Sequence, residues 1–91
     1  MQIRTVSDFR KAYKTGPYAW PGGYPMFFVT ADGGTLSWKA AQECRGEIVR
    51  SIARQDMHSG WRVVGVDINW EDESLYCDHT GEKIPSAYGE D

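Results

Sequence analysis

The segment WRVVGVDINW, residues 61–70, decides the fold because it has the most regular hydrophobic pattern in the sequence. Its alternate positions form two sets: Val64, Val66, Ile68 and Trp70 on one face, and Val63, Gly65, Asp67 and Asn69 on the other. A period of two residues is typical of a β-strand with one buried face. The segment therefore predicts a strand.

A second strand and a hairpin lie upstream of this segment. Residues 26–31 (MFFVTA) are mostly aromatic or β-branched, and the sequence Asp32-Gly33-Gly34 supplies a tight turn before Thr35 and Leu36. The pattern predicts a strand, a turn and a short returning strand. After the acidic turn at residues 71–74, residues 75–77 predict another strand, followed by a turn at residues 78–81 and a segment, residues 83–88, able to pair back.

Two segments have helical periodicity. Residues 38–56 form the main predicted helix, capped by Ser37, with an apolar stripe of Trp38, Ala41, Cys44 or Arg45, Ile48 and Ile52. Gly46 in its middle costs about 1 kcal/mol relative to alanine, so we expect another backbone to approach closely there. Residues 5–15 predict a short helix that begins at Thr5 or Ser7 and stops at Gly16.

The segment between the first helix and the first strand, residues 16–25, is rich in glycine, proline and aromatic residues. Its glycines and prolines exclude regular structure, and its aromatic side chains either pack over the core or form an exposed patch. Together the elements predict an α+β fold: an antiparallel sheet of three or four strands, one main helix on one face and a short N-terminal helix. At 91 residues, we expect a single domain spanning residues 1–91.

The composition is that of a folded, soluble chain, with 41% hydrophobic and 25% charged residues. No stretch reaches the roughly 18 apolar residues of a membrane span, and the N-terminus lacks the apolar run of a secretory signal. We therefore expect no membrane partner and a cytoplasmic location. In that compartment the two cysteines, Cys44 and Cys77, are predicted to be thiols.

Charge is distributed unevenly along the chain. Residues 1–66 contain nine Lys or Arg and five Asp or Glu, whereas residues 67–91 contain one lysine and eight acids. Negative potential in the last quarter favours contact with basic surfaces. An acidic end that only improves solubility is the alternative interpretation.

No pattern in the sequence requires catalysis or a metal. Cys77 and His79 point to the same face of a strand, but a structural zinc site needs four ligands, and the other candidates, Cys44 and His58, are isolated. A Cys77–His79 nucleophile pair needs hydrogen-bond contact, and neighbours along one strand lie too far apart for it without a turn. Phosphate-binding and hydrolase motifs are absent. We predict no catalytic residue, no metal ligand and no cofactor.

Most of the chain, in residues 5–25, 28–38 and 60–91, resembles a group of small phage and prophage proteins of unassigned function. Members of that group carry two Cys-x2-Cys pairs of zinc-ribbon type, and the corresponding positions here are Ser37, Ala40, Cys77 and Thr80. Of these four positions, only Cys77 is still a cysteine, the residue type that binds zinc. The resemblance therefore implies a degenerate zinc ribbon in which apolar packing replaces the metal, a phage origin, and action inside a bacterial host cell. By analogy with anti-CRISPR proteins of similar size and charge, it also suggests an inhibitor.

Two functional hypotheses follow. The first is a non-enzymatic phage-type protein that inhibits or redirects a bacterial nucleic-acid-handling complex, such as a CRISPR–Cas ribonucleoprotein, through an acidic and aromatic surface. Its contact residues would be Asp67, Glu71, Asp72, Glu73, Asp78, Glu82, Trp20, Trp70, Tyr76 and Tyr88. The alternative is a metal-free nucleic-acid-binding module that uses Arg45, Arg50, Arg54 and Arg62, although interleaved acids disfavour direct binding of nucleic acid. Both monomer and homodimer remain open.

Overall fold

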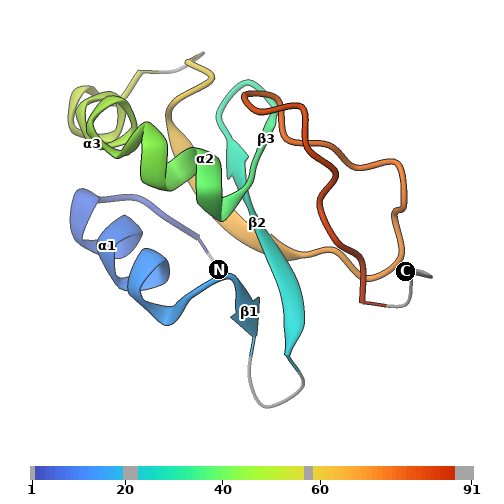
Figure 1. The fold of residues 1–91 in the computed structure, drawn as a ribbon. Helices are drawn as coiled ribbons and strands as arrows, with labels where there is room; N and C mark the ends of the chain where they lie inside the picture. The colour runs from blue at the N-terminus through green and yellow to red at the C-terminus, as the bar shows by residue number, and fades with distance from the viewer. Residues whose placement is uncertain (1, 20–22, 57–58, 88–91) are drawn as a thin grey trace.

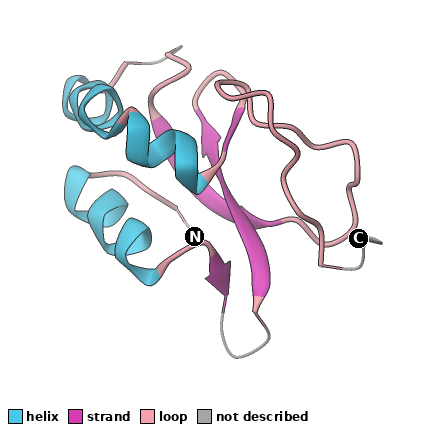
Figure 2. Ribbon diagram, in the orientation of Figure 1, coloured by secondary structure: helices cyan, strands magenta, loops and turns pink. Residues whose placement is uncertain are grey.

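The computed structural model describes residues 2–19, 23–56 and 59–87. Within these residues the chain forms three helices and a four-stranded antiparallel sheet, which confirms the predicted α+β class (Figure 2). The elements are α1 (Val6–Thr15), β1 (Tyr18–Ala19), β2 (Tyr24–Thr30), β3 (Thr35–Leu36), α2 (Trp38–Glu43), α3 (Arg45–Arg54) and β4 (Val63–Ile68). No helix in the described part of the chain is long and apolar enough to cross a membrane.

The strand β2 is the centre of the sheet. It pairs antiparallel with β1 through Tyr18 and Pro25, with β3 through Phe28 and Leu36, and along most of its length with β4. The short strand β1 corrects the expectation that residues 16–25 have no regular structure. In Figure 1 the three helices stand on one side of this sheet, and the chain after β4 runs on the other side.

The strand β4 corrects the predicted division of faces. The pairing shifts by one residue between Val29 and Thr30, so that Thr30 lies opposite Val63 while Val29 lies opposite Gly65. Val64 is the extra residue in this irregularity, and the alternation of side chains between the two faces of the sheet is interrupted there. Val63 is therefore buried in the core together with the half-buried Val66, although the regular pattern places these two residues on opposite faces.

The predicted main helix is two helices. The backbone of Cys44 leaves the helical region, with φ −115° and ψ 27°, and α2 and α3 run in different directions on either side of it (Figure 1). Gly46, which follows closely, has low helix propensity, and bends in helices concentrate at such residues. The predicted cap is confirmed, because the Ser37 hydroxyl accepts a hydrogen bond from Ala40 N at 3.1 Å.

The core forms where the helices meet the sheet. Phe28 of β2 packs against Phe9 of α1, with ring centroids 5.5 Å apart, and against Trp38 of α2, at 4.0 Å. The helix α1 begins where the sequence predicts, because Thr5 and Asp8 form a reciprocal capping box. The hydrogen bonds that Asp8 accepts from the Arg4 and Thr5 backbone lower the pKa of its carboxyl group.

The segment after β4, residues 69–87, is held mainly by isolated hydrogen bonds. Tyr76 and Lys83 form a single antiparallel bridge, and Cys77 N donates to Glu82 O at 2.8 Å. Residues 83–88, which the sequence predicts to pair back, thus form one bridge instead of a strand. The last of them lies outside the described residues. The segment joins the rest of the fold where Asp78 N donates to Thr35 O at 2.9 Å.

Candidate binding surfaces

The acidic turn, residues 70–74, is built around the buried side chain of Asn69. Asn69 is only 3% exposed. Its side-chain Nδ2 donates to the backbone oxygens of Asp72, Ile84 and Pro85 at 2.9, 3.3 and 3.1 Å. Its Oδ1 accepts from Asp72 N at 3.1 Å. The Asp72 carboxylate in turn accepts from the backbone N and hydroxyl of Ser74. The acidic residues therefore sit on an ordered turn.

Two aromatic residues accompany these acids at the surface. Trp70 is 43% exposed and its ring lies 4.7 Å from that of Tyr24, centroid to centroid, while Tyr76 is 52% exposed. Trp20 and Tyr88, the other two predicted aromatic contacts, lie outside the described residues. Glu71, Asp72 and Glu73 are all exposed.

The remaining predicted acids have partners within the fold. Asp67 accepts from Ile68 N at 2.8 Å, and Asp78 accepts from Thr35 N at 2.9 Å. Glu82 forms a salt bridge with Lys39 of α2 at 3.0 Å, which raises the pKa of that lysine. All three acids are exposed, but these contacts give Asp78 and Glu82 a role in joining the C-terminal segment to the sheet and α2.

The four arginines of the nucleic-acid hypothesis lie in different surroundings. Arg50 pairs with Glu47 at 3.4 Å, and the half-buried Arg62 donates to Asp56 O at 3.1 Å. Arg54 is exposed in the last turn of α3. Arg45 instead faces α1, where its guanidinium carbon lies 5.7 Å from the centre of the Tyr13 ring.

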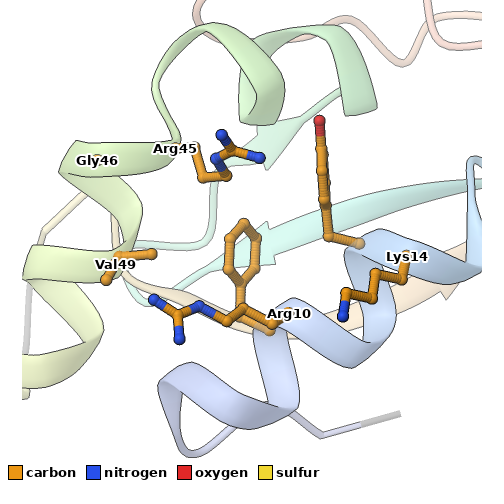
Figure 3. Close-up of a pocket in the computed structure, with 7 residues that line it drawn as sticks. Arg10, Lys14, Arg45, Gly46 and Val49 are labelled. Atoms are coloured by element: carbon orange, nitrogen blue, oxygen red, sulfur yellow. The ribbon is translucent and has the colours of Figure 1, made fainter.

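Between α1 and α3 lies a cavity of about 410 Å³, which we call the basic groove (Figure 3). Three cationic side chains surround it, and its other lining is apolar or lacks a side chain; the full set is Phe9, Arg10, Tyr13, Lys14, Arg45, Gly46 and Val49. The sequence does not predict this site. The i, i+4 spacing of Arg10 and Lys14 was visible, but their approach to Arg45 depends on how two helices pack.

Three of the four positions that the zinc-ribbon resemblance singles out are linked by hydrogen bonds around a buried thiol. Cys77 is 2% exposed, and its Sγ accepts from Ser37 N at 3.4 Å. Burial raises the pKa of the Cys77 thiol, but hydrogen bonds from Thr80 and Ser37 outweigh burial and leave it below the ordinary value of 9.0. The fourth position, Ala40, is buried in the core.

His79 pairs with the other cysteine. Its Nε2 lies 3.3 Å from the Sγ of the half-buried Cys44 and 3.8 Å from a carboxylate oxygen of Glu43, and its ring meets Trp61 edge-on. The turn at residues 78–81 separates His79 from Cys77, so the structure does not assemble a Cys77–His79 pair. Within the described residues no cluster of three or more His, Cys, Asp or Glu could hold a metal ion.

Comparison with known proteins gives no relative. No protein family, no curated protein and no solved structure matches this chain.

Proposed function

We propose that this protein is a non-enzymatic binding protein that uses the acidic turn to occupy a basic surface on a bacterial nucleic-acid-handling complex. The observation that carries the proposal is the anchoring of the turn by Asn69, which holds exposed acids beside a half-exposed indole. A solubilising acidic tail needs no such framework. A surface ordered before binding loses less conformational entropy when a partner docks.

The chemistry of the turn fits a basic partner. Exposed carboxylates accelerate and orient the approach of a cationic surface, whereas a tryptophan at the centre of a contact supplies much of its stability. Tyr24 supports the Trp70 ring from one side, so the indole is positioned rather than freely rotating. Binding by this surface requires no turnover chemistry.

The resemblance to phage proteins directs the choice of partner. A phage protein that covers a basic surface of a host complex blocks the site where that complex holds nucleic acid. CRISPR–Cas ribonucleoproteins are therefore the first complexes to test, followed by host polymerases. The partner would be a bacterial protein or ribonucleoprotein, and the outcome would be inhibition or redirection of its activity.

The test is capture of host complexes on the immobilised protein from nuclease-treated bacterial lysate. The variant Glu71→Lys/Glu73→Lys reverses the exposed charge but keeps Asp72, which forms the turn. A matched control, Glu43→Lys/Glu47→Lys, makes the same change of net charge on the helices. We expect wild type and control to retain the same complex at physiological salt and the acidic-turn variant to lose it.

A second variant, Trp70→Ala, removes the apolar contact and leaves the charge unchanged. We expect it also to fail to retain the complex. Equal retention by wild type and the acidic-turn variant would contradict the proposal. Retention only when nuclease is omitted would also contradict it, since nucleic acid would then bridge the two proteins.

A further inference from the structure

The basic groove has an uncompensated positive charge. Arg10 and Lys14 lie one turn apart on α1, Arg45 faces them from α3, and all three are exposed. Within the described residues none of the three has a carboxylate within 4.0 Å, whereas Lys39 and Arg50 each have an acidic partner. Like charges at i, i+4 repel one another. An anion bound between the two helices would therefore relieve the repulsion between Arg10 and Lys14.

The floor of the groove is apolar. Phe9 lies beneath it, fully buried, with its ring 6.1 Å from that of Tyr13, so the core supports the floor from below while Tyr13 and Val49 supply its exposed apolar surface. Val49 and Tyr13 are half-buried beside it. Arg45 is held over the Tyr13 ring, which positions one guanidinium before any ligand arrives. A volume of about 410 Å³ is within the range of small-molecule sites.

Gly46 keeps this groove open. Glycine has low helix propensity, and packing does not require it in this first turn of α3, because a Cβ added at Gly46 would meet nothing within 4 Å. This corrects the expectation that another backbone approaches closely at Gly46. Gly46 lines the groove without a side chain, so a larger residue there would add side-chain atoms to the lining.

From these observations we propose that the basic groove binds a small phosphorylated ligand that carries a planar or apolar group, the chemistry of a nucleotide. Three cations complement the two or more negative charges of a phosphate better than the single charge of a carboxylate. The two guanidinium groups can each donate a pair of hydrogen bonds to phosphate oxygens. The apolar floor accepts the rest of the ligand. The site is independent of the acidic turn.

The test is calorimetric titration of the full chain with ADP and UDP, one purine and one pyrimidine nucleotide, at low ionic strength. Adenosine, uridine and pyrophosphate are titrated separately to measure the contribution of each half of the ligand. We expect saturable binding at one site, and binding weaker by about tenfold or more for each half alone. Equal binding of pyrophosphate and ADP would overturn the role of the floor.

Variants assign the binding to the groove. Arg10→Gln and Arg45→Gln should each weaken ADP binding about tenfold, the loss expected for a charge-assisted hydrogen bond. Arg10→Gln should also leave the melting temperature of the free protein unchanged or higher, because it relieves repulsion, so that loss of binding is not loss of fold.

Gly46→Leu should block the groove without unfolding the protein, since its Cβ meets no other atom. The matched control is Ala53→Leu, an exposed position two turns further along α3 that does not line the groove. Absence of saturable binding to both nucleotides at millimolar concentration would overturn the proposal. So would binding that Gly46→Leu leaves intact, or binding only to longer oligonucleotides.

Discussion

The two charged regions of this protein are built in opposite ways. The basic groove is formed by regular helices, whose backbone hydrogen bonds are internal and whose apolar floor is part of the core. The acidic turn lies in a segment with one isolated bridge, and its shape comes from side chains that bond the backbone, above all Asn69. The acidic and basic parts of the sequence nevertheless meet where Glu82 forms its salt bridge with Lys39.

This difference shows where each surface is vulnerable. Surface substitutions on the helices change charge but leave the groove in place, because its geometry depends on helix packing. In the C-terminal segment a few buried polar groups determine the conformation, and losing one of them leaves several backbone groups without a partner. Substitution of single residues in each region tests this difference.

The largest effect is expected for Asn69→Ala. The substitution removes the donor to the backbone oxygens of Asp72, Ile84 and Pro85; the Ile84 contact is buried and the other two are partly buried. We expect the free energy of unfolding to fall by about 2–4 kcal/mol, since each unsatisfied buried group costs roughly 1–3 kcal/mol. Urea unfolding followed by tryptophan fluorescence measures this loss.

The control for Asn69→Ala is Asp67→Ala, which removes an exposed side chain from the neighbouring strand. It should change stability by less than about 0.5 kcal/mol. Equal effects of the two substitutions would show that the acidic turn does not depend on Asn69, and the contrast between the two regions would fail.

The next largest effect is expected at Gly34, where the hairpin turn meets the C-terminal segment. A Cβ at this position would overlap the Asp78 carboxylate and approach the Thr30 hydroxyl to 2.8 Å. Gly34→Ala must therefore displace Asp78 and weaken its hydrogen bond with Thr35 N, at a cost of about 1–2 kcal/mol. Thermal unfolding measures the effect. An unchanged melting temperature would mean that the two segments separate easily.

The sequence predicts the helical half of the fold better than the C-terminal half. Local signals locate α1, its cap at Thr5, the cap of α2 at Ser37 and the hairpin turn, because each depends on residues within a few positions of one another. The pattern of residues 61–70 identifies the strand but divides its faces wrongly, since the register shift depends on pairing with β2. The bend at Cys44 is likewise not visible in a helical stripe that continues on both sides of it.

The candidate surfaces depend on still longer separations. Asn69 falls on the polar face of the predicted strand, and only the return of residues 84 and 85 gives its amide buried partners. Cys44 and His79 are 35 residues apart, so the local sequence gives no indication that they lie in contact. The sequence indicates which segment is acidic, but not that Asp78 and Glu82 contact the sheet and α2, because those contacts join residues 43 positions apart.

Cys77 should make stability depend on pH. Its pKa is lower in the folded than in the unfolded state, because hydrogen bonds from Thr80 and Ser37 outweigh burial. The unfolded chain therefore binds more protons between the two pKa values, and stability rises with pH across that interval. We expect the difference in unfolding free energy between wild type and Cys77→Ala to grow as the pH rises toward 9.0, the ordinary value. It should shrink as the pH falls through this interval and become constant below the folded-state pKa.

Cys44→Ala is the matched control for this titration, because it removes the other thiol and keeps Cys77. It should show the same dependence on pH as wild type in urea unfolding under reducing conditions. A dependence that disappears in Cys44→Ala and persists in Cys77→Ala would assign the effect to the wrong thiol and contradict the predicted role of the Ser37–Thr80 environment.

The smallest effect has the opposite sign and lies in the basic groove. Gly46→Ala adds a methyl group with no atom within 4 Å and replaces glycine, a poor helix former, in the first turn of α3. We expect the free energy of unfolding to rise by less than about 1 kcal/mol, measured by urea unfolding of the ligand-free protein. A decrease would mean that the bend at Cys44 needs glycine nearby, so that Gly46 serves the fold of α3. An increase supports the interpretation that Gly46 is kept for access to the groove, since a more stable helix was available by a single substitution.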